Sequence, residues 1–373
     1  MFQSHVRAAF ATLWFFTGLQ GAQAEGAPPT TSVTQTAMGH AGELALSAGG
    51  PGFLAVWEQQ APTGAKEKEI WYALLDPKGA MKRAPAKLMG GLSMVSDNGY
   101  PHSLRLFRQE ARWLAVVCAS TSGNAGEAVW GTVDDAGKYT AVGKYASQPA
   151  DEHFRCNLGA RSGHKIDLAV MGTIDEDGAS NNCVTQLLQL SADEPKPKVI
   201  LAAKNLCMEA GAPIDGGHIS VGPDGGYEGI GAVLIVTPGA PPKKTAFPHM
   251  FTGMTQGPDG RPVLLSWHDT EWRLVHLDGQ AKATSSVPVK GVPGDWIDHF
   301  ARVGAGFVVS IKKGRDQSLH LLAKDGQVRA SWAVDRAMIV GSWAGTADGA
   351  ARLWVAHTKG RLGTIKFSRF ESK

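Results

Sequence analysis

Short apolar runs separated by tight turns extend along almost the whole chain, and this pattern constrains the fold more than any other feature. Within the runs, apolar and polar side chains alternate with the period of two that is typical of strands half-buried in a sheet. Gly, Asp and Pro break the runs, and almost no stretch has the spacing of an amphipathic helix. The sequence therefore predicts an all-β protein.

The predicted strands recur in groups of four, which we call A to D in chain order. In the clearest group, four strands lie between His249 and Val289, with turns at Gly257–Gly260 and Asp278–Gly279. The next group repeats this order between Ile297 and Val334. Four strands recurring about every 40 to 50 residues are typical of the blades of a β-propeller.

Upstream of His249 the same order is less complete. Second and third strands of three further groups are predicted over residues 53–59, 70–76, 113–120, 128–134, 167–174 and 183–190. Between Gly217 and Phe247 the pattern is degraded. There we interpret HISV as strand A, Gly222–Gly225 as a turn and GAVLIVT as strand B, while two outer strands are not legible.

The last group, from Gly341 to Phe370, is one strand short. The segment Thr30–Ala37 supplies a spare strand near the other end of the chain. Pairing the two would close a ring and remove the exposed sheet edges of an open array. We therefore predict a β-propeller of seven four-stranded blades, closed by the N-terminal strand; the degraded group leaves counts of six or eight open.

These units resemble the repeats of bacterial secreted β-propellers, in which a strand rich in Leu, Val and Trp is followed by a second strand and an Asp-Gly turn. The resemblance covers nearly all of the chain after residue 24. It implies an architecture but no activity. It also implies that strand A lines the central channel. The loops that enter strand A would then lie on the face where propellers usually bind ligands.

The N-terminus has the layout of a secretory signal peptide. Arg7 precedes the apolar stretch Ala8–Leu19, and Ala22-Gln23-Ala24 offers small residues for cleavage. A membrane-spanning helix needs roughly 20 apolar residues, and no stretch after Ala24 approaches that length. We expect residues 1–24 to be removed and residues 25–373 to form a single propeller domain in the periplasm or outside the cell.

Four cysteines, Cys118, Cys156, Cys183 and Cys207, would meet oxidising conditions after export. Four cysteines allow three connectivities, among which the sequence alone does not choose; a local Cys183–Cys207 bridge is the one we favour, and buried free thiols are the alternative. The net charge is only +3 and the positive charges are spread. This argues against nucleic acid or an anionic membrane as a ligand and favours a protein or glycan partner.

Histidines recur at the predicted starts of the inner strands. The five that we assign to this position are His40, His102, His153, His218 and His249, with His299 as a looser sixth. A ring of imidazoles at the channel mouth could hold one zinc, copper, iron or manganese ion. The alternative is a repeated hydrogen bond between neighbouring blades, which would give the same spacing without a ligand.

Charged residues lie beside several of these histidines. Asp151, Glu152 and Asp298 could orient an imidazole or act as a general base. Arg105 and Arg155 each follow a histidine by two or three residues and could bind a carboxylate, or could form salt bridges between blades.

Two functions follow from these patterns. We favour an exported binding scaffold that holds its ligand at the channel mouth and on long polar rim loops, predicted at Gln59–Lys68, Ser120–Gly126 and Asp175–Asn182. The alternative is a metal-dependent lyase, hydrolase or oxidoreductase with a histidine-bound ion on the propeller axis.

Overall fold

The computed structural model describes most of the chain as strands and turns. The described residues are 24–25, 28–37, 43–60, 68–89, 103–121, 125–147, 155–162, 164–174, 182–204, 208, 210–214, 217–224, 230–237, 240–241, 243–246, 250–292, 296–313, 316–334, 341–347, 349–357 and 362–371. Within these ranges there is no helix, and so none that could cross a membrane.

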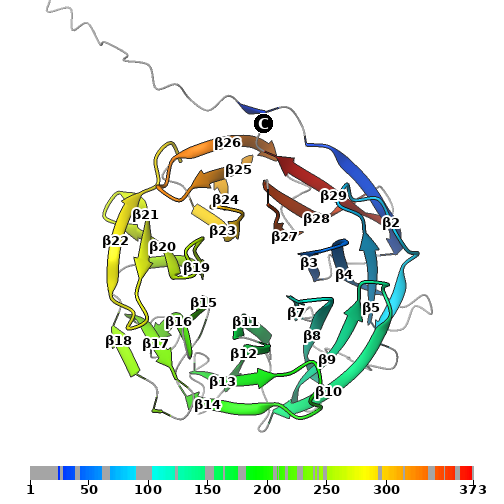
Figure 1. The fold of residues 1–373 in the computed structure, drawn as a ribbon, viewed down its shortest axis with the longest axis horizontal. Helices are drawn as coiled ribbons and strands as arrows, with labels where there is room; N and C mark the ends of the chain where they lie inside the picture. The colour runs from blue at the N-terminus through cyan, green and yellow to red at the C-terminus, as the bar shows by residue number, and fades with distance from the viewer. Residues whose placement is uncertain are drawn as a thin grey trace, which may run out of the picture.

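Seven antiparallel sheets of four strands are arranged as blades around a central axis (Figure 1). Blades 1 to 3 consist of β3 (Leu44–Gly49), β4 (Gly52–Gln60), β5 (Lys68–Leu75) and β6 (Ala86–Met89); β7 (Ser103–Gln109), β8 (Arg112–Thr121), β9 (Ala125–Asp134) and β10 (Tyr139–Ser147); and β11 (Arg155–Ser162), β12 (Lys165–Ile174), β13 (Asn182–Leu190) and β14 (Lys198–Lys204).

Blades 4 to 6 continue the series in chain order. They consist of β15 (Ala210–Ile214), β16 (Gly217–Asp224), β17 (Ile230–Val236) and β18 (Lys243–Ala246); β19 (Met250–Gln256), β20 (Pro262–His268), β21 (Glu271–Leu277) and β22 (Ala283–Pro288); and β23 (Trp296–Val303), β24 (Gly306–Lys313), β25 (Asp316–Ala323) and β26 (Val328–Val334). In each blade the first strand lies next to the central axis and the last lies at the rim (Figure 1).

Blade 7 is assembled from both ends of the chain. Its inner strands are β27 (Gly341–Gly345), β28 (Gly349–His357) and β29 (Leu362–Glu371), and its outer strand is β2 (Thr30–Ala37). Strands β2 and β29 pair antiparallel, with Thr30 opposite Ser368 and Ala37 opposite Leu362. The predicted seven-bladed propeller and its closure by the N-terminal strand are therefore confirmed.

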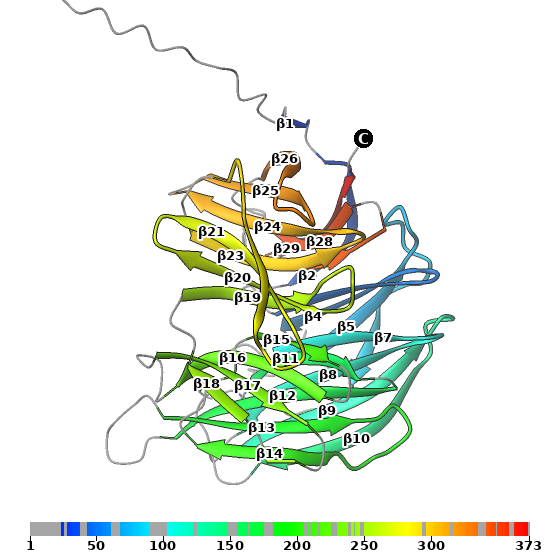
Figure 2. The same ribbon diagram turned by 60° about the vertical axis from the view of Figure 1, so that its left-hand side comes forward.

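A further short strand lies just before the closing strand. Residues Ala24 and Glu25 form β1, which pairs parallel with Ser331 and Trp332 on the outer edge of β26. Figure 2 shows this segment outside the ring, beside blade 6. The N-terminal segment thus contacts two neighbouring blades, blade 6 through β1 and blade 7 through β2.

The blades pack face to face, and each of the seven contacts holds a hydrophobic cluster. Between blades 7 and 1, for example, Val33, Leu353 and Phe367 pack with Phe53 and Trp57. Alternate residues of each strand point to opposite neighbours, so both faces of every sheet are buried. This explains why the second strand of most blades is an almost continuous run of apolar residues in the sequence.

The predicted Asp-containing turns have a local cause. In the β5–β6 connection, the Asp76 carboxylate accepts hydrogen bonds from the backbone N–H groups of Lys78 and Ala80, each at 2.8 Å. Gly79 closes the turn with a φ of +85°, which glycine adopts at little cost. The turn after Asp134 repeats this arrangement with Gly137 at +79°.

In blade 4, each strand that we interpreted from the sequence lies one position further from the axis than expected. HISV belongs to β16, the second strand, and GAVLIVT belongs to β17, the third. Residues Gly222 to Asp224, which we expected in a turn, pair with β17 instead. The inner strand β15 contains Gly and Pro, and the outer strand β18 is fully exposed, so neither has the alternating pattern by which a strand is recognised.

A disulfide joins Cys118 of β8 to Cys156 of β11 and so connects blades 2 and 3. Their Cα atoms lie 5.4 Å apart. Of the three possible connectivities, only the one that pairs Cys183 with Cys207 contains this bridge. Cys207 and the side chain of Cys183 lie outside the described residues, so that second bridge stays a prediction.

Replacing Val33 of the closing strand with Asp should destabilise the ring. Val33 is 2% exposed in the cluster between blades 7 and 1, and an unpaired carboxylate there should lower the free energy of unfolding by more than about 3 kcal/mol. Guanidinium chloride unfolding measures the change.

The neighbouring variant Ser32→Asp is the control. Ser32 is exposed on the same strand beside the Lys366 ammonium group, so its replacement should change stability by less than about 0.5 kcal/mol. A Val33→Asp protein as stable as the wild type would show that β2 is not needed to hold the ring closed.

Candidate functional site

The sequence-predicted site residues fall into three groups in the structure. The side chains of Arg105, His218 and His299 are described. Arg155 and Asp298 are placed by backbone only, in β11 and β23. Outside the described residues lie His40, His102, Asp151, Glu152, His153 and His249.

Arg105 lies near the start of the inner strand β7 and pairs with Glu43, which directly precedes the inner strand β3. Its Nη1 atom is 3.5 Å from the Glu43 Oε1 atom and donates a 2.7 Å hydrogen bond to the carbonyl of Leu104. Both side chains of the ion pair are 33% exposed. The pair therefore connects blades 1 and 2 at the end of the propeller axis where the inner strands begin.

Burial disfavours the charged form of Arg105. Burial lowers the pKa of its guanidinium, and the adjacent Glu43 carboxylate opposes this shift. An arginine keeps its proton at neutral pH, so the channel end carries a fixed cation beside a carboxylate. Of the two roles expected for Arg105, the structure shows the ion pair between blades.

His299, on the inner strand β23, packs at the contact between blades 6 and 7. Its ring centroid is 6.2 Å from that of Trp343 on β27, and the Arg352 guanidinium lies over the same Trp343 ring at 4.4 Å. Burial, and then the positive charge of Arg352, lower the pKa of His299 to about 4. The Nε2 atom has no hydrogen-bond partner among the described residues.

His218 is not at the start of an inner strand, contrary to our interpretation of blade 4. It lies on the second strand, β16, and is 1% exposed. Its neighbour Ile219 packs toward blade 5, so alternation directs His218 toward blade 3, on the same face as Leu234 and Val236. Burial lowers its pKa to about 4, and neither ring nitrogen has a partner among the described residues.

The two described histidines of the predicted ring thus lie in different blade contacts. Within the described part of the chain, no three His, Cys, Asp or Glu side chains form a group that could hold a metal ion. The predicted metal set is untested, because four of its five histidines fall outside that part.

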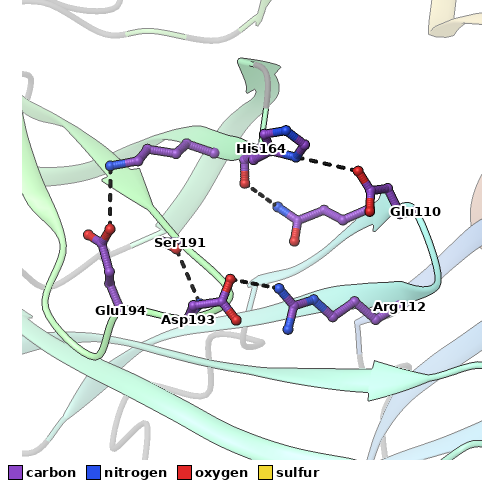
Figure 3. Close-up of polar contacts among 8 residues, drawn as sticks. Glu110, Arg112, His164, Ser191, Asp193 and Glu194 are labelled. Carbon is purple, nitrogen blue, oxygen red and sulfur yellow. Dashed lines mark hydrogen bonds and ion pairs between the residues drawn. The ribbon is translucent and has the colours of Figure 1, made fainter.

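A mixed-charge pocket that the sequence analysis missed lies between blades 2 and 3, at the opposite end of the inner strands (Figure 3). Its volume is about 660 Å³. The β7–β8 hairpin supplies Glu110 and Arg112, the start of β12 supplies Lys165, and the β13–β14 turn supplies Asp193 and Glu194.

Ion pairs connect the two blades across this pocket. The Arg112 Nη2 atom is 2.8 Å from the Asp193 Oδ2 atom, which lowers the pKa of Asp193. His164 Nδ1 lies 3.5 Å from Glu110 Oε1, and these side chains point toward each other in Figure 3. Glu110 has a φ of +37°, unusual for a residue other than glycine. Because these side chains are partly or largely exposed and form ion pairs with one another, we assign the pocket no ligand.

No family model matches the chain, and no curated protein matches it. Similar solved structures include a streptogramin B lyase at 10% identity and a TM-score of 0.52, covering 91% of this chain and 97% of that one. The acylaminoacyl peptidase of Pyrococcus horikoshii matches at 9% identity and 0.54, over 91% of this chain. A prolyl endopeptidase matches at 11% identity and 0.51, over 84% of this chain.

The match covers 54% and 46% of the two peptidases, so this chain spans about half of their length. At these identities the likeness shows the fold alone, a β-propeller.

Lowering the pH should destabilise the wild type more than a His218→Leu variant. Because the folded pKa of His218 is lowered to about 4, the unfolded state binds the proton first as the pH falls below about 6.5. The contribution of the neutral His218 to the free energy of unfolding is therefore fully present above about pH 6.5. It is lost as the pH falls toward 4, at up to about 1.4 kcal/mol per pH unit. Urea unfolding at about pH 7 and pH 5 measures it.

Ser220→Ala is the matched control, because Ser220 lies on the same face of β16 and does not titrate in this range. It should keep the pH dependence of the wild type. If His218→Leu also keeps that dependence, His218 is not the group that titrates.

Proposed function

We propose that the protein is an exported binding scaffold that holds a protein or glycan partner at the channel end where the inner strands begin. The observation that carries this proposal is the Arg105–Glu43 ion pair at that end, fixed between two blades and one-third exposed. Charged groups that are partly exposed and held by a rigid framework are suited to bind a partner with little loss of entropy.

The pair offers two complementary contacts. The planar guanidinium of Arg105 can bind a carboxylate of a partner in a bidentate manner, and Glu43 can accept hydrogen bonds from hydroxyl or amide groups. Side chains of this kind at the margin of an interface set orientation and specificity more than affinity. A partner with both acidic and hydrogen-bond-donating groups fits this arrangement.

The disulfide supports export. Disulfides form and persist in secreted and periplasmic proteins and are rare in the cytosol. The Cys118–Cys156 bridge joins two blades, and it accords with the signal peptide expected at residues 1–24.

Site-specific crosslinking tests the scaffold. A photoreactive amino acid at Glu43 should give one discrete crosslinked adduct in cells that export the protein, whereas the same amino acid at Arg329, exposed on the outer strand β26, should give none. The substitution Arg105→Gln should weaken the adduct at position 43 several-fold, since one hydrogen-bonded charge contact is lost. Equal labelling from positions 43 and 329 would contradict the proposal.

The second candidate function is a metal-dependent enzyme. His102 and His249 directly precede in sequence the first residues of β7 and β19, inner strands whose starts face the same end of the channel. A propeller of this size can itself be an enzyme, because the streptogramin B lyase is matched over 97% of its length. This support is an analogy of fold.

Metal content separates the two functions. For the enzyme we expect about one equivalent of zinc, copper, iron or manganese in the mature protein, lost in a folded variant with His102, His153 and His249 all changed to Ala. Elemental analysis measures it, with circular dichroism to show that the variant folds. Metal-free protein, or metal that the variant retains, would leave the scaffold as the function.

A further inference from the structure

A second pocket lies where the ring closes, at the end of the inner strands opposite to Arg105 and Glu43. We call it the closure pocket. Its volume is about 590 Å³, and blades 1, 6 and 7 all contribute to it. Its principal lining residues are Gly50, Phe53, Pro77, Arg302, Thr346 and Arg369.

Glycines make the pocket possible by letting the blades approach with no side chain between them. A Cβ atom on Gly345 would lie 2.2 Å from the carbonyl oxygen of Arg302 in the next blade. A Cβ atom on Gly304, whose φ is +47°, would lie 2.3 Å from the carbonyl of Ala347. At these two positions the backbones of blades 6 and 7 are packed directly against each other, and any larger residue would push them apart.

The charged side chains that line the pocket are two arginines, and no acidic residue is among its lining residues. Arg369 is held in place, because its Nη1 atom donates a 2.6 Å hydrogen bond to the carbonyl of Pro77 and its Nε atom lies 2.5 Å from Glu371 Oε1. Arg302 is exposed, and among the described residues its Nε atom donates a long 3.5 Å hydrogen bond to the carbonyl of Gly304. Arg302 thus keeps donors available for an anion.

Thr346 also lines the pocket. Its hydroxyl is closed off from solvent and has no hydrogen-bond partner among the described residues, so it lies in the wall and out of reach of a ligand in the pocket. Phe53, Ala48 and Ala347 add apolar surface to the lining.

We infer that the closure pocket binds a small organic anion, whose carboxylate or phosphate group is held by Arg302 and Arg369 while its carbon skeleton lies against the apolar part of the lining. Arginine is the side chain best suited to bind both oxyanions, through paired N–H donors. The volume falls within the range of small-molecule sites. Binding here would stabilise the junction of blades 1, 6 and 7.

Thermal unfolding with two probes tests the site. About 10 mM inorganic phosphate or succinate, against sodium chloride of equal ionic strength, should raise the Tm of the wild type by about 2 °C if the Kd is near 1 mM. A response to phosphate alone, or to succinate alone, identifies which oxyanion the pocket prefers. Isothermal titration should show one saturable site.

Two variants should abolish the response by different routes. Arg302→Gln removes the exposed cation. Gly50→Glu keeps both arginines but adds a carboxylate to the pocket lining, and a Cβ atom at Gly50 is 3.7 Å from its nearest neighbour, Nη2 of Arg108, so the variant should fold.

Arg329→Gln is the matched control, since it removes an exposed arginine outside the pocket and should keep the wild-type response. No Tm shift in the wild type, or an equal shift in Arg302→Gln and the wild type, would overturn the inference.

Discussion

The pairing of β2 with β29 is the interaction on which the rest of the structure depends. Each blade buries both faces of its sheet only if it has a neighbour on each side, and blade 7 has neighbours on both sides only when the ring is closed. The ladder from Thr30 opposite Ser368 to Ala37 opposite Leu362 joins residues from opposite ends of the chain. Because closing such a long loop costs entropy before any contact is gained, the hydrophobic cluster around Val33 must offset that cost.

The contacts between blades are not equivalent. The cluster between blades 3 and 4 is the smallest among the described residues, and buried polar side chains, including Asp167, Thr185, His218 and Ser220, lie on the strands that form this contact. By contrast, the contact between blades 2 and 3 contains a disulfide as well as an apolar cluster. Stability is therefore distributed unevenly around the ring, and acid should act first where neutral histidines are buried.

The two ends of the inner strands offer different chemistry. At the end where the inner strands begin, Arg105 and Glu43 present a balanced pair of charges from adjacent blades. At the other end, the closure pocket presents two arginines and no acidic residue in its lining. A propeller can carry such separate sites because its framework is fixed by contacts between blades, which leaves the hairpins and strand ends at both faces open to variation.

The sequence by itself determined the strand pattern, the turns and the closing strand, because each depends on local properties: alternation of apolar residues, Asp and Gly at turn positions, and a spare strand at one end. It misplaced blade 4, whose inner strand contains Gly and Pro and whose outer strand is fully exposed, so that local pattern carries little information there. Of the candidate site it identified Arg105 as a charged residue near the channel. Only the tertiary structure decided its partner Glu43, the bridge from Cys118 to Cys156 and both pockets. These features join residues from different blades, and a sequence pattern of local period does not specify which side chains two packed blades bring together.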